Sequence, residues 1–248
     1  MQPSSNLDEG LDMSAKAWSH SRLSVFEGCK YRFDLAYLQK IPEPERPLPP
    51  GKTEHANDRG TRIHEAAERY IKGGVELIDE LQKFKEEFEQ AREMFAAGKA
   101  TTEGEWAYTR NWEPVAWMSS DVWCRIKCDL VVHMTEADAV VVDFKSGKRR
   151  FNELKHAEQM QLYVLGALCK YPKIEKVTTE LWYLDLDEIS SMTYTREQGL
   201  RFLKNFERRG TLLTECEEFP PNPNVHTCRF CPFKAKELGG TGHCKVGV

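Results

Sequence analysis

Two aspartates lie on neighbouring segments whose residue pattern predicts β-strands. Apolar side chains occupy every even position of residues 122–133, so a strand there places Asp129 on the less apolar face. Along residues 139–145, Asp143 and Lys145 are two positions apart and therefore share a face. Two carboxylates beside an ammonium group suit hydrolytic chemistry on a phosphate ester.

A hairpin would bring the two aspartates together. If the connection is a loop centred on Glu136, Asp129 and Asp143 lie opposite one another, with Cβ atoms roughly 4.5–5.5 Å apart. Carboxylates that close repel each other unless a cation lies between them, and Mg²⁺ or Mn²⁺ is the natural partner for carboxylate oxygens. With Lys145 beside them, the pair predicts a metal site for attack of water on a phosphodiester. The alternative is a hairpin with ordinary surface charges, because Asp-x-Lys is a common tripeptide.

Three cysteines near the C-terminal end have the spacing of metal ligands. Cys228 and Cys231 are separated by two residues, which lets both thiolates turn toward one ion, and Cys244 follows. His226 or His243 as the fourth ligand would give a zinc site within this segment. A redox pair is less favoured, because no thioredoxin-like βαβ pattern surrounds it. We interpret four further cysteines as small core or surface residues: Cys124, Cys128, Cys169 and Cys216.

Composition limits the kinds of protein that this chain can be. The 248 residues are 40% hydrophobic and 30% charged, and the mean hydropathy is −0.59, which is typical of a soluble globular protein. No run approaches about 18 apolar residues, so we expect no membrane span. The N-terminal residues lack the apolar stretch of an export signal, so we expect a cytoplasmic protein without a disulfide framework. The formal net charge of −4 requires any nucleic-acid surface to be a local patch.

The elements that must position these groups follow from hydrophobic periodicity. Residues 1–18 are expected to form a flexible tail, and the prolines between positions 42 and 50 predict an irregular connection. Amphipathic or helical patterns occupy 21–39, 60–73, 75–97, 152–169 and 197–213, and strand patterns occupy 104–145, 177–186 and 191–195. This order predicts a single α/β domain over residues 19–248, with a mixed central sheet flanked by helices.

Four motifs, in this order along the chain, resemble those of the RecB-type branch of the PD-(D/E)XK nucleases. Residues 60–64, GTRIH, match its GxxxH motif, and residues 126–130, IKCDL, lie where the family has its aspartate motif. Residues 141–148, VVDFKSGK, resemble its third motif, and residues 159–163, QMQLY, match its QxxxY signature. The resemblance implies a restriction-endonuclease-like catalytic core, here residues 60–215.

The resemblance also implies roles for individual residues. Asp129 and Asp143 would be carboxylate ligands of the catalytic metal, and the backbone carbonyl of Phe144 would be a further ligand. His64 would offer an imidazole nitrogen, which biases the site toward Mn²⁺ over Mg²⁺. Lys145 would orient the attacking water or stabilise the charge that grows on the phosphate.

Further candidate residues surround this set. Gln159 and Tyr163 share one helical face, which in the family lies over the site, although a polar position and a core tyrosine would give the same pattern. Glu105, on the strand before the hairpin, is a weaker candidate for an additional acidic ligand. A basic cluster follows the third motif and would contact DNA phosphates, unless it is only a solvated loop; it comprises Lys148, Arg149, Arg150 and Lys155.

A segment at residues 19–33 resembles the N-terminal segment of CRISPR adaptation nucleases and AddB-type helicase-nucleases. In those families one N-terminal and three C-terminal cysteines hold a [4Fe–4S] cluster, which here would join residues 19–40 and 216–248 into a cysteine clasp. This chain departs from the family in having Lys30 in place of the usual proline and a long final cysteine gap. Zinc is the alternative occupant. The implied ligands are Cys29, Cys228, Cys231 and Cys244.

Together these observations predict a metal-dependent deoxyribonuclease, an exonuclease acting on single strands or duplex ends in recombination, repair or DNA processing. The chain has no P-loop helicase motif, so we expect a nuclease module like stand-alone phage or CRISPR-type relatives. DNA is the expected partner, with a recombinase, helicase or single-strand-binding protein as the expected kind of protein partner. The alternatives are a non-catalytic DNA-binding or assembly protein that keeps the fold, and a zinc-ribbon interaction protein.

Overall fold

The computed structural model describes residues 17–45, 47–147, 149 and 152–248. The chain divides into two compact units, one made of Glu45–Gly210 and the other of the described parts of Met1–Pro44 and Thr211–Val248. The predicted tail therefore lies almost wholly outside the described residues, as do Lys148 and Arg150 of the predicted basic cluster. The predicted single domain over residues 19–248, with its core and clasp, stays a prediction.

A six-stranded mixed sheet forms the centre of the larger unit, as the sequence predicts, in the order β2-β1-β3-β4-β5-β6. All neighbouring strands are antiparallel except β4 and β5, which are parallel and joined by a helix that crosses from one end of the sheet to the other. The strands are β1 Ala100–Tyr108, β2 Pro114–Val115, β3 Cys124–His133, β4 Asp138–Lys145, β5 Lys176–Tyr183 and β6 Glu188–Thr195.

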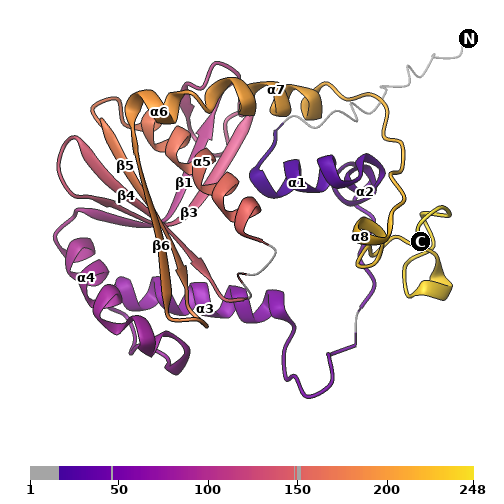
Figure 1. Cartoon of the computed structure of the whole chain (residues 1–248), viewed down its shortest axis with the longest axis horizontal. Coiled ribbons are helices and arrows are strands. Elements are labelled where there is room, and N and C mark those ends of the chain that lie inside the picture. Colours follow the sequence, from indigo (N-terminus) through magenta and orange to yellow (C-terminus); the bar gives the residue numbers. More distant parts are fainter. Residues whose placement is uncertain (1–16, 46, 148, 150–151) are drawn as a thin grey trace, which may run out of the picture. The chain divides into compact units, whose positions relative to one another are not determined.

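Helices cover both faces of this sheet (Figure 1). The crossover helix α5 lies on one face and α6 packs against it, whereas α3 and α4 lie on the other face. The single helix predicted at 75–97 is divided in the structure, because a short 3-10 helix precedes α4. The helices of this unit are α3 Ala56–Ile71, the 3-10 helix η2 Asp79–Phe84, α4 Lys85–Ala96, α5 Glu153–Lys170 and α6 Arg196–Leu200, with α7 Leu203–Thr214 crossing the unit boundary.

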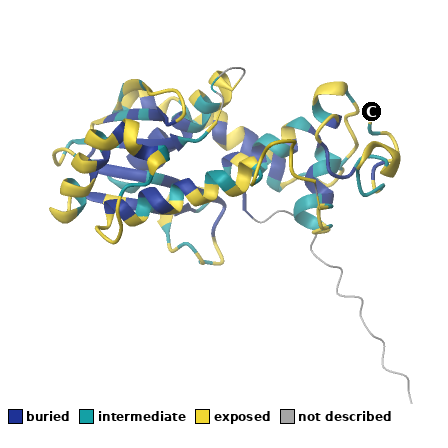
Figure 2. Ribbon diagram, turned by 90° about the horizontal axis from the view of Figure 1, so that it is seen from below, coloured by how far each residue is buried: buried dark blue, intermediate teal, exposed yellow. Residues whose placement is uncertain are grey.

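Aromatic rings join the strands to α4 and η2. Phe144 at the end of β4 contacts Phe88 with ring centroids 5.3 Å apart, and it contacts Trp182 of β5 at 5.4 Å. Phe84 stacks on Trp182 at 5.7 Å. Figure 2 shows buried residues along the strands and on the helix sides that meet them. This packing fixes the backbone around Phe144, next to Asp143 and Lys145.

The opposite face brings α5 close to the sheet at Gly166. A Cβ atom added there would lie 2.6 Å from Ile126 Cδ1 and 3.0 Å from Trp106 Cε3. The Tyr108 hydroxyl donates a 2.7 Å hydrogen bond to the carbonyl oxygen of Gly166. Glycine is therefore required here by close approach of the helix rather than by its backbone angles.

The predicted alternation along residues 122–133 is wrong in one respect, because the even positions do not share a face. Ile126 points toward α5, whereas Leu130 packs in the cluster formed with α3 and α4. The neighbouring strand β1 behaves in the same way, with Trp106 toward α5 and Ala100 in the other cluster. Both strands therefore exchange faces midway along their length, where Glu103 of β1 has a φ of +49°.

The smaller unit combines both ends of the described chain. Phe33 contacts Phe26 and Phe219, and Leu35 packs with Phe233, so N-terminal and C-terminal segments share a core. The amphipathic segment predicted at 21–39 is helical, in three consecutive pieces. The helices of this unit are α1 His20–Gly28, α2 Lys30–Phe33, the π-helix η1 Asp34–Leu38, α8 Val225–Cys228 and the 3-10 helix η3 Lys236–Leu238.

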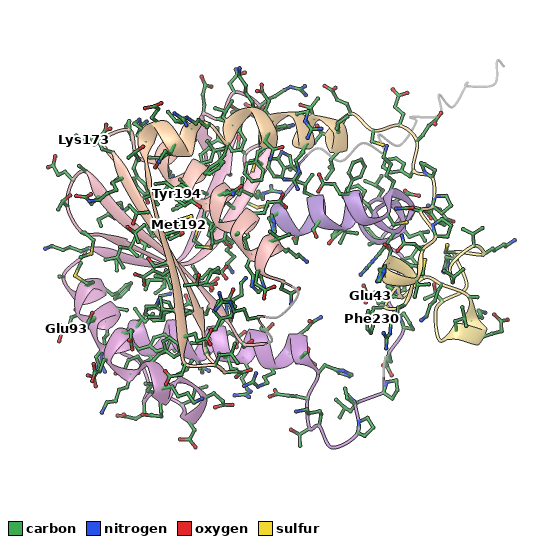
Figure 3. All side chains as sticks on the ribbon, viewed as in Figure 1. Glu43, Glu93, Lys173, Met192, Tyr194 and Phe230 are labelled. Carbon is green, nitrogen blue, oxygen red and sulfur yellow. The ribbon has the colours of Figure 1, made fainter. Side chains whose placement is uncertain are left out.

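Two further observations concern the edge of the sheet and the character of the helices. The edge strand β6 exposes Met192, whose residue exposure is 58% and whose sulfur accepts a 2.8 Å hydrogen bond from Tyr194 (Figure 3). Among the described helices, none combines the length and the apolar character that a membrane crossing requires.

Replacement of Gly166 should destabilise the larger unit. We expect Gly166→Ala to lower the free energy of unfolding by about 1–3 kcal/mol, since overpacking in a close-packed interface forces neighbours to move. Gly147→Ala is the control, because a Cβ there meets nothing within 4 Å. Urea unfolding followed by circular dichroism measures both, and equal midpoints for the two variants would contradict the packing at Gly166.

Candidate active site

Asp129 and Asp143 occupy the positions that the predicted hairpin assigns to them. The β3–β4 ladder pairs Leu130 with Val142 and His133 with Ala139, so the predicted centre at Glu136 is confirmed. One step beyond Leu130 and Val142, this register places Asp129 opposite Asp143. At this point a side chain takes the place of a backbone acceptor: the backbone N–H of Phe144 donates a 2.6 Å hydrogen bond to Asp129 Oδ2.

His64 contacts the same aspartate from α3. Its Nδ1 lies 3.0 Å from Asp129 Oδ1. Burial lowers the pKa of His64, but the hydrogen bond and charge of Asp129 outweigh that effect, so its pKa is raised above the usual value. Burial, followed by the nearby charge of Asp143, raises the pKa of Asp129 despite the opposing effect of His64. The two aspartates therefore share a buried, negatively charged environment that favours a cation.

Glu103 joins this group, although the sequence interpretation did not include it. Ligand atoms of His64, Glu103 and Asp129 lie within 4.8 Å of one another, and Glu103 also forms an ion pair with Lys127. The β1–β3 register places Glu103 opposite Asp129, since the flanking residues of β1 pair with those of β3. Its left-handed φ of +49° is a strained conformation for glutamate, of the kind that is stored at functional sites.

Glu105, the acidic residue predicted instead, is exposed and lies opposite Lys127 in the ladder. It does not belong to the three-residue group. The pattern of β1 gives no sign that Glu103 leaves the ordinary strand conformation. Once the β1–β3 register is known, however, Glu103 can be recognised as a candidate ligand because it lies opposite Asp129.

Asp143 is 3% exposed and lies beside Lys145. Its Oδ2 forms an ion pair with Lys145 Nζ at 2.5 Å. Buried carboxylate oxygens are normally satisfied by hydrogen bonds or ligands. Lys145 therefore neutralises this oxygen, and the partly buried group of His64, Glu103 and Asp129 is the donor set that fits a divalent cation preferring oxygen and imidazole ligands.

Gln159 and Tyr163 of α5 hold the aspartate and the lysine in place. Gln159 Oε1 accepts a 2.9 Å hydrogen bond from Lys145 Nζ, and its Nε2 donates to the Tyr163 hydroxyl at 2.7 Å. That hydroxyl donates to the carbonyl oxygen of Lys127 at 2.7 Å and lies 3.2 Å from Asp143 Oδ1. Burial raises the pKa of Tyr163, so the phenol remains protonated and able to donate. Tyr163 is thus both a core tyrosine and part of the polar network.

Gly60 allows α3 to approach the segment after β4. A Cβ atom at this position would lie 3.3 Å from Ser146 Oγ, which is tighter than ordinary contact. Arg59 adds a hydrogen bond to the carbonyl oxygen of Ser146 and a 2.8 Å ion pair with Asp185. The spacing of glycine and histidine in this helix therefore places His64 next to Asp129 while the helix start fits closely against the β4 end.

The predicted basic cluster is only partly described. Arg149 forms a 2.8 Å ion pair with Glu188, and its guanidinium lies over the ring of Tyr183 at 5.3 Å from the centroid. Lys155 is exposed on α5. Lys148 and Arg150 lie outside the described residues, so their predicted DNA contacts stay predictions.

Four cysteines in the smaller unit line one cavity. All four are free and buried, and they are the predicted set Cys29, Cys228, Cys231 and Cys244. No three of their sulfur atoms lie within 4.8 Å of one another in the described part of the chain. Neither His226 nor His243 belongs to the lining, and His243 Nδ1 lies 2.7 Å from the Thr241 hydroxyl.

The other cysteines have no such arrangement. Cys124 and Cys128 are buried, and burial raises the pKa of both thiols well above the usual value. Cys169 and Cys216 are partly buried. This agrees with their interpretation as small core or surface residues.

Comparison with known proteins gives a family and two distant structural likenesses. A family model described as the PD-(D/E)XK nuclease superfamily matches residues 17–235. The solved structure of SSO0001 is 13% identical, with 93% of this chain and 88% of that chain covered and a TM-score of 0.41. A protein from Eubacterium rectale named "Putative exonuclease" is also 13% identical, with 91% of each chain covered and a TM-score of 0.43. None of the curated proteins compared with the chain matches it.

Loss of the Glu103 carboxylate should weaken the binding of a divalent cation. We expect Glu103→Gln to lower the affinity for Mn²⁺ by about tenfold or more, because a carboxylate close to His64 and Asp129 is removed. Glu105→Gln removes an equal charge two residues away and should leave the affinity unchanged. Calorimetric titration with Mn²⁺ distinguishes the variants, and an equal loss in both would exclude Glu103 as a ligand.

Proposed function

The chain belongs to the PD-(D/E)XK nuclease superfamily, and we propose that it is a metal-dependent deoxyribonuclease that removes nucleotides from single strands or duplex ends. The observation that carries the proposal is the buried Asp143 carboxylate, which is paired with Lys145 and lies opposite Asp129 in the strand register, next to the group of His64, Glu103 and Asp129. A scaffold protein has no need for two opposed carboxylates, one buried and one partly buried, since they cost stability without a cation.

The residues that would hold the cation are His64, Glu103 and Asp129, whose ligand atoms lie within 4.8 Å of one another, with Asp143 and the Phe144 carbonyl as further proposed ligands. When bound, a divalent cation supplies a water of lowered pKa and polarises a phosphoryl oxygen. The protein positions the carboxylates in advance: Phe144 N–H and His64 orient Asp129, while Gln159 and Tyr163 orient Asp143. Little reorganisation is then needed during the reaction.

Lys145 provides the cationic group of the proposed reaction. Asp143 and Gln159 hold its ammonium at 2.5 Å and 2.9 Å, which restricts Nζ to the space beside the carboxylates. A proton on Nζ can donate a hydrogen bond to a non-bridging phosphate oxygen or to the attacking water. This interaction strengthens as negative charge develops on the phosphate, so it favours the transition state over the ground state.

The cysteine site of the smaller unit supports a second part of the proposal, a bound [4Fe–4S] cluster. Zinc with Zn–S distances of about 2.3 Å places thiolates about 3.8 Å apart in a tetrahedron. The four sulfurs line one cavity and, in the part of the chain that the structure describes, no three of them lie within 4.8 Å of one another, which is looser than a tetrahedral zinc site. The proposal of a cluster therefore depends on the cysteine order along the chain, which four thiolate ligands of a [4Fe–4S] cluster would use. Zinc remains the alternative, and it would require the sulfurs to approach each other.

Removal of the Lys145 ammonium should abolish most of the nuclease activity. We expect Lys145→Ala to lower kcat by about 10²–10³-fold, the usual loss when a group that stabilises transition-state charge is deleted. Lys173→Ala removes an exposed lysine between α5 and β5 and should retain activity (Figure 3). EDTA should stop cleavage by the parent, and Mn²⁺ should restore it.

End-labelled single and double strands, with a covalently closed circle beside them, measure this activity. Mononucleotides from linear DNA and an intact circle identify an exonuclease, and cutting of the circle would contradict that part of the proposal. Equal cleavage by Lys145→Ala and the parent would exclude the proposed chemistry. DNA binding without any cleavage by the parent would favour the non-catalytic alternative.

The bound group in the smaller unit should be visible in the spectrum of the protein. A brown preparation with broad absorbance near about 400 nm is expected of iron–sulfur thiolate coordination. Cys228→Ser should remove this absorbance, whereas Cys216→Ser should leave it, because Cys216 is not in the cavity lining. A colourless preparation with stoichiometric zinc would contradict the cluster without affecting the nuclease proposal.

A further inference from the structure

His156 lies next to the proposed catalytic lysine but has no part in the chemistry described above. It is one turn before Gln159 on α5, so the two side chains are neighbours on the helix, with Cβ atoms about 5–6 Å apart. Gln159 in turn accepts the hydrogen bond of Lys145. The imidazole is partly exposed, so a ligand can reach it.

Tyr183 fixes the orientation of this imidazole. Its hydroxyl lies 3.0 Å from His156 Nδ1, and the two rings are 5.7 Å apart. Tyr183 is paired with Lys145 in the parallel β4–β5 ladder, so both side chains emerge on the same face of the sheet. The tyrosine is 1% exposed, and Arg149 covers the ring at 5.3 Å. His156 is therefore near Lys145 in two ways. It is a helical neighbour of Gln159, which contacts Lys145, and it contacts Tyr183, which is paired with Lys145 in the ladder.

The other ring nitrogen of His156 is available for a ligand. Within the described part of the chain, Nε2 makes no hydrogen bond, whereas Nδ1 is paired with Tyr183. Burial raises the pKa of Tyr183, so this phenol stays protonated and can donate to Nδ1. In the tautomer in which Tyr183 donates to Nδ1, the ring proton is on Nε2, which then presents an N–H donor; this is the tautomer on which the proposal depends. Burial, then the Lys145 charge, lowers the pKa of His156, so the ring is uncharged near neutral pH.

We propose that His156, oriented by Tyr183, donates a hydrogen bond from Nε2 to the DNA phosphate adjacent to the one that is cleaved. The inference rests on the proposed nuclease function and adds a residue that positions the strand. In this proposal Lys145 contacts the cleaved phosphate, and His156, on the helix that also carries the lysine's partner Gln159, contacts the next phosphate. The start of α5 is close to His156, and the positive end of a helix also favours an anion.

The contact differs from an ordinary basic contact, because the donor is neutral. Arg149 is the nearest described cation on the other side of Tyr183, but Glu188 already pairs with it. A neutral donor adds affinity without releasing a counterion from the DNA, whereas a lysine or arginine contact steepens the dependence on salt. The salt dependence of binding therefore separates the proposed contact from charge attraction.

Steady-state cleavage of a single-stranded oligonucleotide by the full chain in Mn²⁺ tests the proposal. We expect His156→Ala to raise KM by about tenfold with kcat within about twofold, since a hydrogen bond to a charged group is lost in both ground and transition states. His156→Gln keeps an N–H donor and should recover most of the loss. Tyr183→Phe should raise KM in the same direction, and the double variant should be no worse than His156→Ala. His133→Ala, which removes an imidazole at the last residue of β3, is the control and should match the parent.

Two further measurements identify the group that His156 contacts. The slope of log KM against log salt should be unchanged in His156→Ala and lower by about one in Arg149→Ala if that arginine meets a phosphate. Oligonucleotides with one neutral methylphosphonate at successive positions should reveal one position at which the parent and His156→Ala have equal KM. That position should adjoin the cleaved bond.

Specific results would overturn the inference. An unchanged KM in His156→Ala, a fall in kcat alone, a reduced salt slope, or a defect that persists with every methylphosphonate each exclude the proposed contact. A parent protein that does not cleave DNA at all would instead remove the proposed function on which the inference rests.

Discussion

Repulsion between the buried carboxylate of Asp143 and the partly buried carboxylate of Asp129 is the constraint on which the rest of the site depends. Asp129 and Asp143 are opposed at the point where the β3–β4 ladder gives way to a side-chain contact. Neither charge is stable in such a place without donors or cations nearby. The surrounding helices supply these groups: His64 from α3 for one aspartate, and Gln159 with Tyr163 from α5 for the other.

The topology of the sheet explains why these groups meet. Because β4 and β5 are parallel, the chain must cross the sheet between them, and the crossover helix starts close to the end of β4 where Lys145 lies. The N-terminal half of α5 therefore covers the two acidic strands, while its C-terminal half packs closely at Gly166. On the other face, the aromatic contacts of Phe144 hold the same strand end against α4. The aromatic packing of Phe144 and the hydrogen bonds of Gln159 to Asp143 and Lys145 thus both fix the backbone of residues 143–145.

Local pattern was sufficient for some of this arrangement and insufficient for the rest. The hairpin register followed from a period of two and a central loop, and so did the opposition of Asp129 and Asp143. Glu103 was not predictable, because its position depends on a left-handed backbone angle and on the exchange of faces by two strands, which arise from tertiary packing. Hydrophobic periodicity also predicted a single helix over 75–97, whereas the structure has the 3-10 helix η2 followed by α4. The spacing of apolar residues hardly distinguishes a short 3-10 helix from the α-helix that follows it.

The smaller unit also bears on how the protein is made. Leu35 shares a core with Phe233 and Cys244, residues about two hundred positions later in the chain. During synthesis, residues 45–210 emerge from the ribosome and can collapse before that core has its second half. The early helices can therefore complete this core only after the segment with Phe233 and Cys244 has been synthesised. Any group that requires Cys29 together with Cys228, Cys231 and Cys244 can consequently bind only after the last of these cysteines has been synthesised.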